Sequence, residues 1–375
     1  GTVVADNTAG WTGGGIHVVG HAPTLTGNTI SGNTSANDGG GVYLDQSAAI
    51  IRANHVIGNT SHDDGGGLRA FESPFVLDAN LIEQNYAADG GGGARVSHVA
   101  ARLTDNLVRD NVAGGTGGGL DLDNDASLVR GGEITGNLAG GSGGGIFGWL
   151  APWTGLVVED VLIAGNHAWQ GGGLYLVDNF MPVTMRGLRV IGNTASKGAG
   201  LMVSATSFEL TRSVLSDNVA TNTGGAIHAG ASVAWTGPCP CPPISPIGQI
   251  AFVVATGNEA PYGSALWTTF AGLSVENSIL FDNAGVAVEA SDTDAAPGIM
   301  VTPHLAYDDI YPPTFAGMED PLDGTSNISV DPQFVSAATG DFHLLADSAC
   351  IDSGDLGLVD VDGSRADMGI YGGVP

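Results

Sequence analysis

Two carboxylates stand two residues apart at Asp121 and Asp123, in the alternating stretch "GLDLD". On a β-strand, residues i and i+2 face the same side and lie about 6.6–7 Å apart. That separation suits the general acid and the general base of an inverting glycosidase. The pair is therefore a candidate catalytic site for polysaccharide cleavage.

Two arginines precede this pair at the same position of earlier repeats. Arg95 lies one repeat length before Asp121, and Arg69 lies one repeat length before Arg95. A polysaccharide lyase would use such an arginine as its base beside carboxylates that hold Ca²⁺, and Lys197 is the only lysine of the chain. Asp121, Asp123, Arg95 and Arg69 are thus the catalytic candidates. A plain outward strand face with mixed side chains is the alternative, and we favour a protein without enzymatic activity.

Aromatic residues recur in the same two outward positions of the repeat. They are Tyr43, Phe71, Phe147, Trp149 and Tyr175. Aromatic rings present a flat apolar surface on which sugar rings can stack. These five residues are the candidates for carbohydrate binding, with an ordinary exposed face again as the alternative.

Other carboxylates lie just before the glycine runs, at Asp38, Asp63, Asp64 and Asp89. Asp38 and Asp64 are one repeat length apart, as are Asp63 and Asp89, so each pair is expected to stack. Stacked carboxylates repel one another unless a cation or a proton intervenes. Ca²⁺, which prefers oxygen ligands, is the expected cation; otherwise the side chains point into water. Four tail carboxylates allow a second Ca²⁺ site or turn hydrogen bonds, of which we favour turns: Asp355, Asp360, Asp362 and Asp367.

These residues are positioned by an internal repeat. An asparagine recurs with a period of about 26 residues, and fixed-period self-similarity of this kind is typical of solenoids. The spacing is constant up to Asn137 and varies beyond it, most of all between Asn218 and Asn258. The copies are Asn7, Asn33, Asn59, Asn85, Asn111, Asn137, Asn166, Asn193, Asn218, Asn258 and Asn283.

Each repeat offers three short apolar stretches, several of which alternate with polar residues, as in "GVYL". This is the period of β-strands and not of helices. The sequence therefore predicts an all-β fold, a single-stranded right-handed parallel β-helix of about 11 coils of about 26 residues with an irregular C-terminal cap. We expect the repeated asparagine to turn a corner in the left-handed conformation and to form an amide ladder. The glycines supply a second bend, and the variable residues face solvent.

Composition restricts the function. The net charge of −28 disfavours binding to nucleic acid. The share of charged residues, 13%, is too low for a disordered chain. No apolar run is long enough to span a membrane. Cys350 is free to pair with Cys239 or Cys241, which would suit an oxidising compartment.

Two segments interrupt the period. Residues 235–248, "WTGPCPCPPISPIG", are a proline- and cysteine-rich insertion that we expect to loop out from a corner. The repeat fades after residue 290. We therefore assign residues 1–290 to the β-helix and residues 291–375 to a capping segment placed to cover the open sheet edge.

Two resemblances follow from these phrases. "GGAI" at 224–227 and "FDN" at 281–283, with "GGGL" and "IxGN" elsewhere, resemble the repeats of polymorphic outer membrane proteins. The tail phrases "NISVDPQFV" and "GDFHLLADSACIDSGD" resemble the closing segment of choice-of-anchor Q proteins, which are secreted bacterial β-helix proteins. The resemblance implies a β-helix and export to the cell surface or the medium. It implies little about chemistry.

Together, these features predict an extracellular or cell-surface module, adhesin-like or structural, that binds polysaccharides or cell-surface glycans. Self-association through long flat faces is a further expectation. The alternative is a polysaccharide lyase or glycoside hydrolase centred on Asp121 and Asp123.

Overall fold

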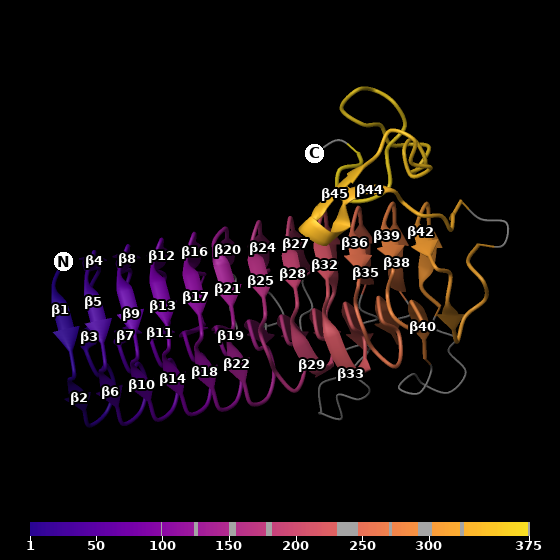
Figure 1. Ribbon diagram of the computed structural model, residues 1–375. Helices are drawn as coiled ribbons and strands as arrows, with labels where there is room; N and C mark the ends of the chain where they lie inside the picture. The colour runs from indigo at the N-terminus through magenta and orange to yellow at the C-terminus, as the bar shows by residue number, and fades with distance from the viewer. Residues whose placement is uncertain are drawn as a thin grey trace, which may run out of the picture.

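The computed structural model describes residues 1–98, 100–123, 127–149, 155–177, 182–230, 247–269, 272–291, 302–322 and 326–373. Over these residues the chain forms a rod of stacked coils (Figure 1). The only helix in these ranges is the short 3₁₀ turn η1 (Ala337–Thr339). The predicted all-β parallel β-helix is confirmed. Among the described residues, no helix has the length and hydrophobicity to span a membrane.

Three long sheets, here named A, C and D, form the sides of the rod. Sheet A contains β1 (Val3–Ala5), β5 (Thr29–Ser31), β9 (His55–Ile57), β13 (Leu81–Glu83), β17 (Leu107–Arg109), β21 (Glu133–Thr135), β25 (Leu162–Ala164), β28 (Arg189–Ile191), β32 (Val214–Ser216), β36 (Val254–Thr256), β39 (Ile279–Phe281) and β42 (Asp309–Tyr311). Sheet C contains β3 (Ile16–Val19), β7 (Val42–Asp45), β11 (Leu68–Phe71), β15 (Ala94–Ser97), β19 (Leu120–Asp123), β23 (Ile146–Trp149), β26 (Leu174–Val177), β30 (Leu201–Ser204), β34 (Ile227–Gly230), β37 (Leu266–Thr268), β40 (Val288–Ala290) and β43 (Phe315–Ala316).

Sheet D and a short corner sheet, sheet B, complete each turn. Sheet D contains β4 (Thr24–Thr26), β8 (Ile50–Arg52), β12 (Val76–Asp78), β16 (Arg102–Thr104), β20 (Leu128–Arg130), β24 (Val157–Glu159), β27 (Val183–Arg186), β31 (Phe208–Thr211), β35 (Ile247–Ala251), β38 (Gly272–Glu276) and β41 (His304–Ala306). Sheet B contains β2 (Thr8–Ala9), β6 (Thr34–Ser35), β10 (Thr60–Ser61), β14 (Tyr86–Ala87), β18 (Val112–Ala113) and β22 (Leu138–Ala139), and the pair β29 (Thr194–Lys197) and β33 (Val219–Thr223) lies further along the same corner.

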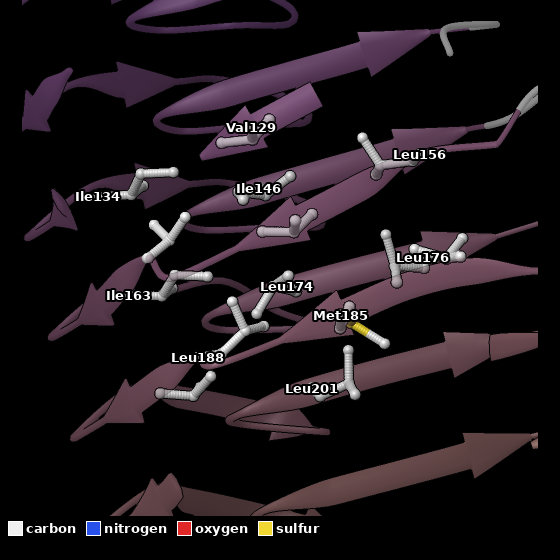
Figure 2. Packing of buried hydrophobic residues seen from close by; sticks show 14 of the residues in the cluster. Val129, Ile134, Ile146, Leu156, Ile163, Leu174, Leu176, Met185, Leu188 and Leu201 are labelled. Carbon is white, nitrogen blue, oxygen red and sulfur yellow. The ribbon is translucent and has the colours of Figure 1, made fainter. Parts of the chain in front are cut away.

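The interior is filled by columns of aliphatic side chains. Val56 pairs with Ile30 on one side and faces Ile82 on the other, and all three are fully buried. Figure 2 shows such side chains converging from sheets A, C and D, for example Ile163, Leu174 and Met185. Each fully buried side chain of this size contributes about 1.5–3 kcal/mol by leaving water. Like residues therefore stack on like residues, as the sequence predicts.

The amide ladder is confirmed at the corner between sheets A and B. Asn111 donates from Nδ2 to Asn137 Oδ1 and to the Ile82 carbonyl, each at 3.0 Å. Its Oδ1 accepts from both the backbone N–H and Nδ2 of Asn85, also at 3.0 Å. The predicted left-handed conformation of the asparagine is wrong, because the residue just before it has the positive φ, as at Asp110 (φ 54°). A second ladder, which we did not predict, joins Asn28, Asn54, Asn80 and Asn106.

The glycine corner needs glycine for close approach as well as for conformation. Gly65 has φ 66°, which agrees with the prediction. A Cβ atom on the next residue, Gly66, would lie 2.5 Å from the carbonyl oxygens of Gly92 and Tyr86. No side chain fits at that distance, so the coils can stack here only through bare backbone.

The C-terminal segment covers a face of the rod and not mainly its open edge, which corrects our prediction. Parallel pairing continues past residue 290 to β43. The chain then folds back over sheet A (Figure 1) through the antiparallel pair β44 (Phe334–Ser336) and β45 (Asp341–Leu344). Phe342 and Met368 bury the outward apolar residues Val254 and Ile279, which supplies the reason for this placement. At the edge strand β42, Ile328 forms a single bridge.

Cys350 is a free, buried thiol. Cys239 and Cys241 lie outside the described residues, as does most of the 235–248 insertion; Ile247 and Gly248 begin β35. The Cys350 Sγ donates to Asp309 Oδ2 at 3.3 Å, and Asp309 Oδ1 accepts from the Val330 N–H at 2.9 Å. Asp309 therefore joins the last strand of sheet A to the tail.

The burial of Asp309 predicts that the attachment of the tail to sheet A depends on pH. Burial raises its pKa from 3.8 to about 6. Because this pKa is higher in the folded protein than in the unfolded chain, the folded protein has its full stability below about pH 4. It loses part of that stability as the pH rises through about 6 and the buried carboxyl ionises. Asp309→Asn, which stays neutral, should match the wild type at pH 4 and exceed its free energy of unfolding at pH 7.5 by at most about 3 kcal/mol. Urea unfolding at both pH values measures this, with the exposed Asp347→Asn as control. The same difference from wild type at both pH values would contradict the prediction.

Candidate functional site

The candidate site lies on the outward side of sheet C, where strand pairing sets the order of its residues. Arg95 pairs with Arg69 on one side and with Asp121 on the other. Asp121 pairs in turn with Phe147, and Asp123 pairs with Trp149. The predicted catalytic residues are therefore neighbours on three consecutive strands, β11, β15 and β19.

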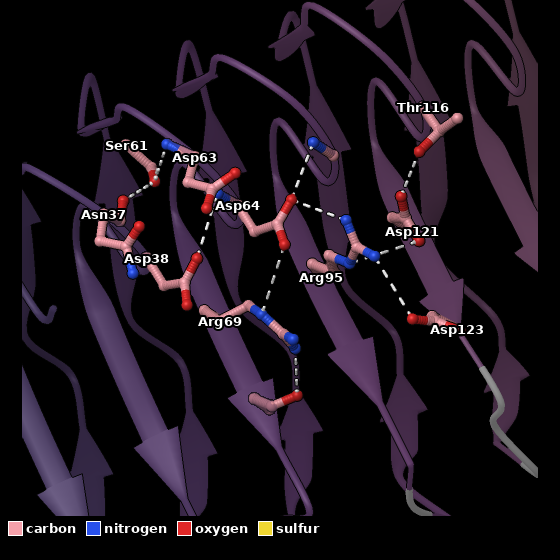
Figure 3. A network of polar contacts seen from close by, with 12 residues as sticks. Asn37, Asp38, Ser61, Asp63, Asp64, Arg69, Arg95, Thr116, Asp121 and Asp123 are labelled. Carbon is pink, nitrogen blue, oxygen red and sulfur yellow. Dashed lines mark hydrogen bonds and ion pairs between the residues drawn. The ribbon is translucent and has the colours of Figure 1, made fainter.

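Three of these four residues are buried and Arg95 is half-buried, although we expected the outward positions to face solvent. Asp121 is fully buried, and less than a tenth of the surface of Arg69 and of Asp123 is exposed to solvent. Figure 3 shows that the side chain of Asp64, from the corner before a glycine run, reaches Arg69 and Arg95 on the strands. Gly90 is in such close contact that a Cβ atom there would lie 2.6 Å from Asp121 Oδ2. Backbone at this corner excludes water from Asp121.

Arg95 is the centre of an ion-pair network (Figure 3). Its Nη1 donates to Asp64 Oδ1 at 2.6 Å, and its Nη2 lies 3.3 Å from Asp123 Oδ2. Its Nε lies 3.9 Å from Asp121 Oδ1. Burial lowers the pKa of Arg95, but the three carboxylates outweigh burial and raise the pKa overall. Arg95 is therefore a permanent cation that compensates several buried carboxylates.

Asp121 has an unusual environment for a carboxyl group. Burial raises its pKa to about 6, against the opposing effect of Arg95. The Thr116 hydroxyl donates to its Oδ2 at 2.5 Å. Three buried atoms of this network make no hydrogen bond within the described part of the chain: Arg69 Nε, Arg95 Nε and Asp121 Oδ1. The same holds for Ser97 Oγ, on the strand position next to Asp123. The network thus retains unused hydrogen-bonding capacity.

Arg69 occupies the next position in the column. Its Nη1 donates to the Ala70 carbonyl at 2.8 Å, and its Nε lies 4.0 Å from Asp64 Oδ2. Burial lowers the pKa of Arg69, and the neighbouring Arg95 lowers it further. The guanidinium also lies 5.7 Å from the centre of the Phe71 ring. Arg69 is therefore held by backbone and by an aromatic ring and is not an exposed base.

Three of the four corner carboxylates come together. Oxygen atoms of Asp38, Asp63 and Asp64 all lie within 4.8 Å of one another. Burial raises the pKa of Asp38 and of Asp63, and repulsion from Asp64 raises both further. Oxygens that share one Ca²⁺ at 2.3–2.6 Å lie at most about 5 Å apart, so the spacing fits that ion. Asp89 is exposed and does not belong to this group.

The aromatic candidates form two groups and not one surface. Phe147 and Tyr175 are ring neighbours, with centroids 5.7 Å apart, and Trp149 beside them is 49% exposed. Tyr43 and Phe71 lie on the other side of the charged network. Phe71 and Trp149 are three coil steps apart, about 14 Å.

We predicted the corner carboxylates and the strand residues as two separate clusters, but Asp64 joins them. Its contact with Arg95 links a corner to the strand of the next coil, a separation of 31 residues that the repeat period does not reveal. Thr116 was also missed. In the tail, the carboxylates cap turns, as expected; Asp355 Oδ1 accepts from the Gly357 N–H and Asp362 Oδ1 from the Ser364 N–H.

The network predicts a large stability loss when Arg95 is removed. Arg95→Leu would leave the buried Asp121 without a cation, at an expected cost of about 3–5 kcal/mol. The double variant Arg95→Leu/Asp121→Leu should recover most of this loss. Arg52→Leu is the control, because Arg52 is exposed and its partner Asp78 is only half-buried, so that its removal should cost much less than the removal of Arg95. Chemical unfolding at pH 7.5 measures all four proteins. Equal stability of the Arg95 and Arg52 variants would contradict this account.

Comparison with known proteins supports the fold. Residues 1–138 match the family described as "right handed beta helix region". No curated protein matches the chain. The resemblances to polymorphic outer membrane proteins and to choice-of-anchor Q proteins stay predictions. The family match and the stacked parallel coils agree that this chain is a right-handed parallel β-helix repeat protein.

Proposed function

We propose that the protein is an extracellular or cell-surface module that binds polysaccharide on the outward side of sheet C. One observation carries the proposal. Trp149, 49% exposed, lies beside the Phe147–Tyr175 pair and directly next to the charged network. An exposed indole ring adjoining hydrogen-bonding groups suits a sugar ring, which has apolar faces and polar edges.

The arrangement along the rod supports a polymeric ligand. Phe147 and Tyr175 lie on successive coils, so their rings follow one another along the rod axis, with centroids 5.7 Å apart. A chain of sugars running along the axis would contact these two rings one after the other. The overall charge of −28 disfavours polyanionic glycans, so neutral polymers fit better. The extracellular location is supported by the resemblance of the tail.

Polysaccharide cleavage is a second candidate function. A carboxyl with a pKa of about 6, such as Asp121, is suited to general acid catalysis near neutral pH. Its complete burial works against this role, since a catalytic acid must reach the bond that it protonates. Binding without cleavage is therefore the function that we favour.

The proposal predicts that Trp149→Ala and Tyr175→Ala each weaken polysaccharide binding about tenfold, the effect of losing about 1.4 kcal/mol. Affinity electrophoresis against neutral and acidic polysaccharides measures this. Trp11→Ala is the control, because Trp11 is exposed at a corner of the first coil. Binding by none of the polymers would overturn the proposal.

Release of reducing ends, or ultraviolet absorbance from new double bonds, that is lost in Asp123→Ala would establish the enzyme instead. Size measurement of the free protein tests the expected self-association.

We also propose Ca²⁺ binding by Asp38, Asp63 and Asp64. Millimolar Ca²⁺ should then raise the midpoint of thermal unfolding, because a ligand that binds only the folded state stabilises it. Asp63→Asn should lose this response, whereas Asp89→Asn, outside the group, should keep it. Equal midpoints with Ca²⁺ and with EDTA in the wild type would sink the proposal. Mg²⁺ is a useful comparison, since it requires shorter, octahedral contacts.

A further inference from the structure

We infer that the rod carries a second saccharide site, separate from sheet C, in a groove along the corner of sheet B. The groove encloses about 460 Å³ and crosses four consecutive coils. Its main side chains are Leu138, His167, Trp169, Thr194, Ser196 and Val219. We name it the corner groove. It goes beyond the function proposed above, because it lies on another side of the rod and contains none of the same residues.

The groove arises from a change in corner length. Five residues separate Asn137 from the first glycine of its run, Gly143, and most other coils have the same number. Only four residues separate Asn166 from Gly171, and the next coil is equally short. Residues 167–170 and 194–197 are therefore shorter corners flanked by longer ones. The stacking itself continues without a break, through the bridges from Leu138 to His167 and from His167 to Thr194.

The lining combines exposed apolar side chains with hydroxyl groups. Trp169 is 65% exposed, and Leu138 and Val219 are also exposed. Hydroxyl groups of Thr194, Ser196 and Thr221 lie among them. The His167 Nδ1 is 2.7 Å from the Thr194 Oγ1, a contact that holds both side chains in place. No Asp, Glu, Lys or Arg is among the described residues that line the groove, in a chain that carries a net charge of −28.

These properties select a neutral saccharide. A charged ligand would find no opposite charge among these lining residues. A sugar ring can place an apolar face on Trp169 while its hydroxyls reach Thr194 and Ser196. Three coil steps make the groove about 14 Å long, enough for a few consecutive rings.

A peptide strand fits less well. Strand addition needs a free sheet edge with unpaired backbone groups. Here β29 pairs with β33 on one side, and Thr194 bridges His167 on the other. The groove therefore presents side chains and not an open edge.

The experiment uses the full chain and soluble neutral polymers, namely laminarin, a galactomannan and hydroxyethyl cellulose, with polygalacturonate as the charged comparison. Affinity electrophoresis should show binding to at least one neutral polymer and at least tenfold weakening in Trp169→Ala. Trp169→Tyr, which keeps an aromatic ring, should retain most of the affinity. Circular dichroism verifies that each variant is folded, and Trp11→Ala is the matched control for an exposed tryptophan.

The two sites can be separated by combining variants. If both exist, Trp149→Ala and Trp169→Ala each leave part of the binding, and the double variant loses it. An effect of Trp169→Ala alone supports the corner groove and rejects the sheet C proposal, and the reverse pattern rejects the corner groove. Unchanged binding in Trp169→Ala, or no binding to any neutral polymer, overturns the inference. Binding of an apolar peptide but no saccharide, lost in Trp169→Ala, also overturns it in favour of a protein partner.

Discussion

Direct stacking of each coil on the next is the constraint on which the rest of the structure depends. Because successive repeats have nearly the same length, a side chain in one coil lies about 4.8 Å from its counterpart in the next. Only groups that tolerate a copy of themselves suit such a column. Aliphatic chains do so by packing, and amides do so because each has both donors and an acceptor, as the Asn85–Asn111–Asn137 ladder shows. Glycine does so where two backbones touch.

Carboxylates are the least favourable side chains in such a column. When ionised, they only accept hydrogen bonds, and they repel their copies in the neighbouring coils. On sheet C, an arginine lies between the carboxylates and compensates their repulsion. Arg95 lies between the corner carboxylate Asp64 and the strand carboxylates Asp121 and Asp123. At Asp38 and Asp63, burial and repulsion from Asp64 outweigh the opposing effect of Arg69, so the pKa values of both carboxyls rise and a further cation is the natural remedy. The same physics thus accounts for the buried network and for the candidate Ca²⁺ site.

The sequence predicts what the period determines and little else. The columns, the amide ladder and the neighbourhood of Arg95 and Asp121 follow from residues spaced one repeat apart. The burial of Asp121 does not, because it depends on how a corner such as that at Gly90 lies over the strands. The position of the tail was mispredicted for a similar reason. Phe342 and Met368 of the tail are 63 to 114 residues away in sequence from Val254 and Ile279, and no periodic pattern encodes such a contact.

Departures from the period therefore indicate where the rod differs from a plain scaffold. A residue added to or removed from a strand would shift its side chains to the opposite face and break the interior columns. A corner is less restricted, because only one small side chain in each, such as Ala168 or Ala195, is buried, and the other side chains lie at the surface. The two four-residue corners at 167–170 and 194–197 leave the amide ladder intact, from Asn166 through Asn193 to Asn218, and still produce a groove lined by Trp169. New binding surfaces on this fold should thus arise at corners, where a one-residue change alters the surface at little cost to the core.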